Sequence, residues 1–119
     1  MYLVALFKNN EGDCFVLAEK TEDIRDYSPS TLQGYKLSQF IITNNRTIAL
    51  KTRLKFRIEE LKSLKEGVDY MGYDESLISQ IGLLTSRLLR RGVDVTDEIA
   101  LQCYDIREGM RRMKQMVQK

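Results

Sequence analysis

The last quarter of the chain repeats apolar residues at alternating spacings of four and three. This spacing keeps them on one stripe of an α-helix and is typical of a helix that packs lengthwise against another helix. We therefore expect a helix over about 96–117, with a contact surface along its stripe for a protein partner or for a second copy of the chain. The six candidate interface residues are Ile99, Cys103, Ile106, Met110, Met113 and Val117.

A second amphipathic helix is expected directly before this one, over about 74–91. Asp74 is placed to cap its N-terminus, and Gly92 can end it in a left-handed conformation. Thr96 is expected to cap the helix that follows. Because the connection between the two helices is so short, they are predicted to be antiparallel neighbours. The apolar stripe of the 74–91 helix consists of Leu77, Ile81, Leu84 and Leu88.

The N-terminal half has the pattern of a small antiparallel sheet. Two apolar runs, 2–7 and 14–18, flank a polar turn and predict a β-hairpin. The run 14–18 is apolar on both faces, so we expect it to be a central strand. A third run, 35–43, leads into Asn44 and Asn45, which favour a turn into a further strand because asparagine tolerates positive φ angles.

The segment 48–58 fits two structures. Its apolar residues alternate with basic ones, which predicts a strand with one basic face, while the spacing from Leu54 to Leu64 also fits a helix. We expect a strand to about residue 56 and a short helix over about 57–65. A helix over the whole segment would instead scatter the basic residues around its axis. These basic residues are Lys51, Arg53, Lys55 and Arg57.

Together these patterns predict an α+β fold. A mostly antiparallel sheet of about four strands is followed by a short helix and an antiparallel helical hairpin. The chain has 119 residues and is 43% hydrophobic, which suits one compact domain over 1–119. In this prediction, residues 1–56 are mainly β and residues 57–119 are mainly α.

Composition narrows the class of protein. No apolar run approaches the roughly twenty residues that a membrane span needs, and no secretion signal is visible, so a cytoplasmic location is the default expectation. Histidine is absent, and the two cysteines, Cys14 and Cys103, lie far apart in the sequence. We expect both to be reduced, buried thiols, and we expect neither a metal site nor a cofactor.

Catalytic patterns are weak. Carboxylates that lie close in sequence, such as Asp105 and Glu108, are typical of solvated helix faces, although acid–base pairs also need such neighbours. The serines lack a histidine partner and a glycine-flanked nucleophile turn. We therefore predict that the protein is not an enzyme.

Two basic clusters suggest an alternative function. On a strand, the basic residues of 51–57 could follow a phosphate backbone, although edge strands commonly carry such charges to prevent sheet association. The second cluster, Arg111, Arg112 and Lys114, is interleaved with methionines and suits an anionic partner, or simply complements the helix dipole. We predict a small interaction or regulatory protein that binds another macromolecule as a homodimer, with nucleic-acid binding through the basic strand face as the alternative.

Overall fold

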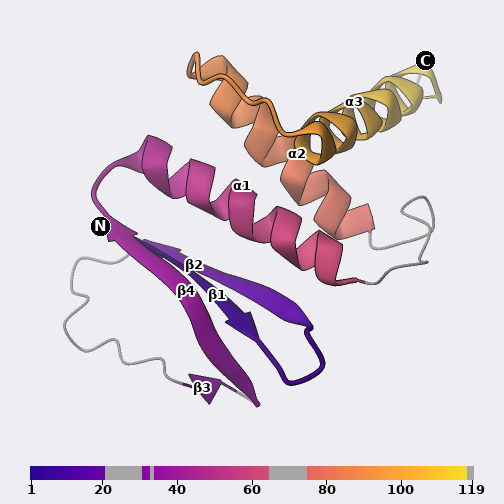
Figure 1. The fold of residues 1–119 in the computed structure, drawn as a ribbon. Helices are drawn as coiled ribbons and strands as arrows, with labels where there is room; N and C mark the ends of the chain where they lie inside the picture. Colours follow the sequence, from indigo (N-terminus) through magenta and orange to yellow (C-terminus); the bar gives the residue numbers. More distant parts are fainter. Residues whose placement is uncertain (21–30, 33, 65–74, 118–119) are drawn as a thin grey trace. The chain divides into compact units, whose positions relative to one another are not determined.

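The structure is a computed structural model and describes residues 1–20, 31–32, 34–64 and 75–117. An antiparallel sheet is followed by three helices (Figure 1), so the predicted α+β class is confirmed. Two compact units are present, residues 1–67 and residues 68–119. The expectation of a single domain over 1–119 stays a prediction. Within the described ranges, no helix is both long enough and apolar enough to cross a membrane.

The sheet contains β1 (Tyr2–Lys8), β2 (Cys14–Lys20), β3 (Thr31–Leu32) and β4 (Tyr35–Thr43), in the order β2-β1-β4-β3. Each neighbouring pair is antiparallel. Strand β1 lies between the two other long strands, and its residues from Leu3 to Phe7 are completely buried or nearly so.

The prediction that 14–18 forms a central strand is wrong, because β2 lies at an edge of the described sheet. Its two apolar faces have separate explanations. Val16 packs into a core cluster with residues of helix α1, on one face of the sheet. On the other face, Phe15 stacks on Phe7 with ring centroids 4.8 Å apart, and Tyr35 contacts Phe15 edge-on at 4.8 Å. A helix on one face and aromatic contacts on the other therefore account for the apolar residues of an edge strand.

The predicted hairpin between β1 and β2 is confirmed, and its turn is fixed by one side chain. The Oδ1 atom of Asn9 accepts hydrogen bonds from the backbone N–H groups of Glu11 at 3.0 Å and of Asp13 at 2.8 Å. Gly12 adopts φ 87°, a left-handed conformation that glycine reaches without strain.

Helix α1 (Arg46–Ser63) replaces the strand that was expected up to residue 56 and the short helix expected over 57–65. Asn45 begins it: its Oδ1 atom accepts a hydrogen bond from the N–H of Ile48 at 3.1 Å, as an N-cap residue does. The alternating pattern therefore led to the wrong structure. An alternating strand over this segment would put Ile48 on its apolar face and Ala49 on its basic face, but Ile48 is 47% exposed and Ala49 is 3% exposed.

The reason for the misleading alternation is that α1 buries a broad face. Its buried residues extend over roughly half the helix circumference at about 100° per residue, so neither a narrow helical stripe nor a single strand face describes them. Ala49 and Phe56 contribute to the core that covers Val4 and Leu6 of β1. The six buried residues of α1 are Ala49, Leu50, Leu54, Phe56, Ile58 and Leu61.

The second unit contains α2 (Glu75–Arg90) and α3 (Glu98–Val117), close to the bounds expected from the sequence. Helix α2 ends as predicted at Gly92, which has φ 76°. The N–H groups of Gly92 and Val93 donate to the carbonyls of Leu89 and Leu88, each at 3.0 Å, which forms a Schellman motif. The predicted cap at Asp74 lies outside the described residues.

The start of α3 differs by one residue from the prediction. Asp97, not Thr96, is the capping residue, because its Oδ1 atom accepts from the N–H groups of Ile99 at 2.9 Å and Ala100 at 3.3 Å. A carboxylate at this position also interacts favourably with the helix dipole.

Helices α2 and α3 pack closely through small residues. The Thr85 hydroxyl donates to the Ile81 carbonyl at 2.8 Å and reaches the Ala100 carbonyl at 3.5 Å. One turn earlier on α2, Gly82 lies against Cys103 and Arg107 of α3. Contacts therefore move forward along α3 as they move backward along α2, so the two helices run in opposite directions, as expected for a helical hairpin.

Candidate interaction surface

The predicted stripe of α3 changes from buried to exposed along its length. Cys103 is 3% exposed, and Ile99 and Ile106 are partly buried. Met110 is 40% exposed, Met113 68% and Val117 84%. We call Met110, Met113 and Val117 the α3 terminal face. The last two turns of α3 thus present an apolar surface that the described residues of the second unit, 75–117, leave largely uncovered.

The contact between α3 and α2 is offset from the predicted stripe, with which it shares Cys103. Ala100 and Arg107 face α2 together with Cys103, and at about 100° per residue they lie roughly 60–80° around α3 from Met110. Sequence reasoning missed both residues. A usable signal was the small residues, Gly82 on α2 and Ala100 on α3, which permit close approach of two helices.

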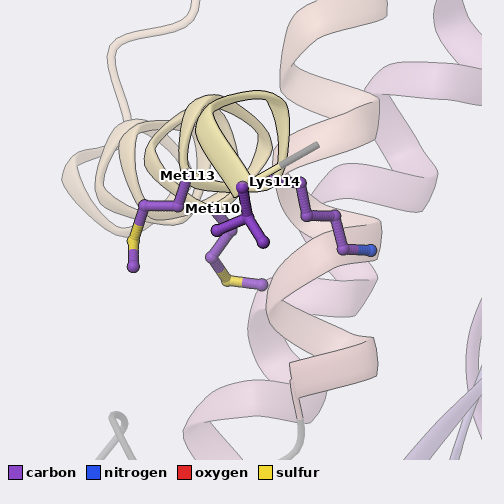
Figure 2. Close-up of a pocket in the computed structure, with 4 residues that line it drawn as sticks. Met110, Met113 and Lys114 are labelled. Carbon is purple, nitrogen blue, oxygen red and sulfur yellow. The ribbon is translucent and has the colours of Figure 1, made fainter. Parts of the chain in front are cut away.

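A shallow groove follows the α3 terminal face. It has a volume of about 450 Å³ and is lined by Met110, Met113, Lys114 and Val117. Figure 2 shows Met110 between Met113 on one side and Lys114 on the other, all projecting from the end of α3. Methionine side chains are unbranched and polarisable, so such a groove can adapt to the shape of an apolar partner.

Positive charge accompanies this groove. Residues 109–117 contain three cations, Arg111, Arg112 and Lys114, and no acidic residue. Arg111 lies 3.7 Å from a carboxylate oxygen of Glu108, a long contact with a largely exposed arginine and therefore of little energetic weight. Within the described part of the chain, neither Arg112 nor Lys114 forms an ion pair. The end of α3 is therefore an apolar surface with a net positive charge.

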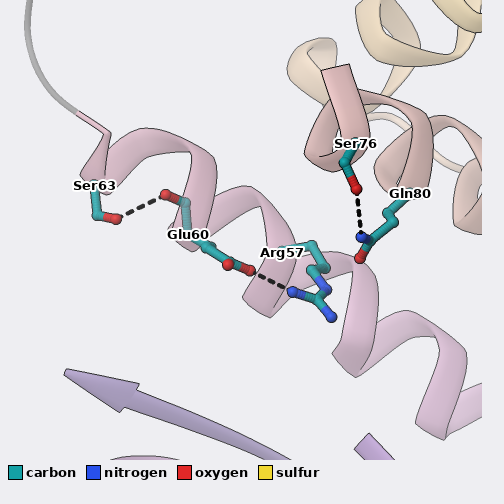
Figure 3. Close-up of polar contacts among 5 residues, drawn as sticks. All are labelled: Arg57, Glu60, Ser63, Ser76 and Gln80. Carbon is teal, nitrogen blue, oxygen red and sulfur yellow. Dashed lines mark hydrogen bonds and ion pairs between the residues drawn. The ribbon is translucent and has the colours of Figure 1, made fainter. Parts of the chain in front are cut away.

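The basic residues of α1 do not form the predicted strand face, because the segment is helical. Lys51 and Lys55 are exposed one turn apart, whereas Arg53 and Arg57 are partly buried and lie roughly 120–160° around the helix from them. Arg57 is also engaged: its Nη1 atom lies 2.6 Å from Oε2 of Glu60 (Figure 3). Only two of the four residues are therefore left on one exposed face, and nucleic-acid binding through this cluster stays a prediction.

The other polar contacts in Figure 3 are local to single helices. Ser63 donates to the Glu60 carbonyl at 2.7 Å in the last turn of α1, and Gln80 donates to the Ser76 hydroxyl at 3.2 Å on α2. Such side-chain contacts three or four residues apart are typical of helix surfaces. These contacts stabilise the helix surfaces locally and do not indicate a binding or catalytic site.

The two cysteines have different environments. Burial raises the pKa of the Cys103 thiol above its ordinary value of 9.0, and the negative charge of Asp97 raises it further. Cys14 is only partly buried, and its Sγ atom lies 3.5 Å from the carbonyl oxygen of Gly12. Among the residues described, no three histidine, cysteine or acidic side chains are grouped as a metal site would need.

A second exposed apolar surface lies on the sheet. Phe40 and Ile42 of β4 are both exposed, on the face that carries the Phe7–Phe15 aromatic pair. The end of α3 combines exposed apolar side chains with a groove and with positive charge, and Phe40 and Ile42 therefore rank second as a candidate contact.

A comparison of the chain with protein-family models, curated proteins and solved structures finds no match. The functional argument therefore depends on the residues of this chain alone. Among the predicted site residues, the structure brings Met110, Met113, Lys114 and Val117 together at one groove.

Proposed function

We propose that this protein is a non-enzymatic interaction protein that binds another protein through the α3 terminal face. The observation that carries the proposal is the rise in exposure along one stripe of α3, from Cys103 at 3% to Val117 at 84%. The same apolar pattern that buries Cys103 against α2 thus continues for two further turns that residues 75–117 cover only slightly.

Exposure of these side chains has a cost that binding would remove. Apolar surface transferred out of water contributes about 25 cal/mol per Å². Single exposed apolar residues are ordinary, but a contiguous patch beside a groove is typical of interaction sites. Met110, Met113 and Val117 are contiguous because they lie three and four residues apart on one helix.

The nucleic-acid alternative has weaker support. A phosphate-binding surface needs several cations on one accessible face. On α1, Lys51 and Lys55 are exposed while Arg57 is paired with Glu60. The end of α3 carries cations, but its groove is apolar, which suits a protein segment better than a phosphate backbone.

A peptide selection tests the proposed function. Random peptides displayed on phage are selected against the full chain, and the selected peptides are then measured against a Met110→Ser/Met113→Ser variant and a Leu101→Ser control. Leu101 is also an exposed apolar residue of α3, but it lies about 180° around the helix from Met110.

We expect the selected peptides to lose at least about tenfold in affinity for the double variant, equal to about 1.4 kcal/mol, and to keep their affinity for the control. Circular dichroism of both variants verifies that the helices are retained. Peptides that bind all three proteins equally would show that the α3 terminal face is not the binding surface.

A further inference from the structure

We infer that the partner bound by the α3 terminal face is an acidic amphipathic helix of another protein. This inference rests on the proposed function and specifies the chemistry of the partner. It follows from the charge around the groove, from the part of α3 that is available for contact, and from the size and composition of the apolar surface.

Charge is the first argument. The groove is bordered by Lys114, and residues 109–117 carry three cations and no acidic residue. A partner with acidic side chains beside its apolar stripe would pair with these cations, whereas a basic partner would be repelled. Charges at the rim of a contact mainly determine which partners are accepted and how fast they associate, while the apolar contact supplies the affinity.

The same charges argue against a second copy of this chain. Two copies of α3 could pair antiparallel so that Arg111 of one copy meets the acidic Asp105 of the other. That alignment would also place Met113 of one copy opposite Cys103 of the other. Cys103 is buried against α2 and cannot take part. A pairing limited to residues 110–117 would instead bring Arg111, Arg112 and Lys114 of both copies together.

The apolar surface is sized for a helix. From Met110 to Val117, the α3 terminal face extends over two turns, or about 10 Å at 1.5 Å per residue. An amphipathic helix presents an apolar stripe with the same three- and four-residue spacing and can lie along such a groove. A helix that binds a lipid surface usually uses bulky Trp, Phe or Leu side chains, and none occurs in residues 109–117.

The test uses three labelled peptides of about five helical turns. The first carries leucine at helical spacing and glutamate elsewhere, the second has lysine in place of each glutamate, and the third has the composition of the first with its stripe scrambled. Their affinities for the full chain are measured by fluorescence anisotropy, together with light-scattering mass and binding to anionic lipid vesicles. The protein variants are Met110→Ser/Met113→Ser, Arg112→Glu/Lys114→Glu, and the controls Leu101→Ser and Lys51→Glu/Lys55→Glu.

We expect the acidic striped peptide to bind at least about tenfold more tightly than the lysine and scrambled peptides. The methionine variant and the Arg112→Glu/Lys114→Glu variant should each lose most of this affinity, and the Leu101 and Lys51/Lys55 controls should keep it. The peptide should gain helical circular dichroism on binding.

Four results would overturn the inference. They are equal binding of the lysine peptide, equal binding of the scrambled peptide, methionine-dependent dimers in light scattering, and methionine-dependent binding to vesicles in place of the peptide. If the phage selection still gives peptides that depend on Met110 and Met113 but are not acidic, the inference fails while the proposed function stands. If no peptide of either kind depends on these methionines, both fail.

Discussion

Gly82 of α2 lies so close to α3 that a Cβ atom at this position would be 2.9 Å from the carbonyl oxygen of Cys103 and 3.0 Å from Cβ of Arg107. Glycine inside a helix costs about 1 kcal/mol relative to alanine. The close approach of the two backbones explains why glycine is nevertheless found here, since a backbone carbonyl cannot turn aside as a long side chain can.

We predict that Gly82→Ala destabilises the protein. Overpacking of a close contact costs about 1–3 kcal/mol, against a gain of about 1 kcal/mol from helix propensity, so the free energy of unfolding should not rise and should fall by up to about 2 kcal/mol. Urea denaturation followed by circular dichroism measures it.

Gly109→Ala is the matched control for Gly82→Ala. Gly109 also lies inside a helix, but a Cβ there would meet no atom within 4 Å. This substitution should therefore stabilise the protein by up to about 1 kcal/mol. Stabilisation of similar size by both substitutions would contradict the close packing of α2 and α3.

The Cys103 thiol should make stability depend on alkaline pH. Burial, assisted by the charge of Asp97, raises the pKa of this thiol in the folded protein above 9.0, so the folded state holds the proton more tightly than the unfolded chain. The contribution of the protonated thiol to stability is fully present below pH 9.0 and is lost as the pH rises through the pKa of the folded protein. Over that range the free energy of unfolding falls by at most about 1.4 kcal/mol per pH unit.

A comparison with Cys103→Ala isolates the contribution of this thiol. The free energy of unfolding of the wild-type protein should fall more steeply than that of the variant as the pH rises through 9.0. Parallel pH profiles would show that the Cys103 thiol has no raised pKa. Slow reaction of Cys103 with a thiol reagent in the folded protein would instead support a raised pKa, because the thiolate is the reactive form.

Asn45→Ala should destabilise α1 by about 0.5–2 kcal/mol, because it removes the side chain that accepts from the N–H of Ile48. Asn44→Ala is the matched control, since Asn44 is a neighbouring exposed asparagine outside the helix and does not cap it. Equal stability of the two variants in thermal or urea denaturation would mean that the helix does not begin at Asn45.

Nucleic-acid binding should be weak and insensitive to the basic residues of α1. For duplex DNA, the slope of log affinity against log salt concentration steepens by roughly 0.9 for each phosphate contact. Replacing Lys51 and Lys55 by serine can therefore reduce the magnitude of that slope by no more than about two. We expect labelled DNA and RNA to show only non-specific binding that disappears at moderate salt. Tight binding lost in Lys51→Ser/Lys55→Ser would instead establish the nucleic-acid alternative.

The sequence predicted the second half of the fold better than the middle. The helices at 75–90 and 98–117 each bury a readable apolar stripe and end at clear signals such as Gly92. In α1, burial over a broad face produced an alternation with the period of a strand, and the capping role of Asn45 was interpreted as a turn. Local pattern cannot separate these structures, because the decisive fact is which faces the rest of the chain covers.

The sequence predicted only part of the candidate surface, again because a local pattern does not show what the rest of the chain covers. The 4-3-4-3-4 spacing placed Met113 and Cys103 on one stripe, but spacing alone contains no information about where the covering helix ends. The contact with α2 depends on Gly82 and Ala100, whose small size is not an apolar signal. Exposure at Met110 and Met113 is thus a tertiary property that only the structure reveals.

The most direct test of the α3 terminal face is methionine-methyl NMR of the full chain, titrated with the acidic striped peptide. The methyl signals are assigned with single Met→Leu variants. We predict that the signals of Met110 and Met113 shift with peptide concentration, while the signal of Met1, which is also exposed, does not. Shifts at Met1 alone, or no shift at Met110 and Met113 when the peptide is bound, would contradict the proposal that this face is the docking surface.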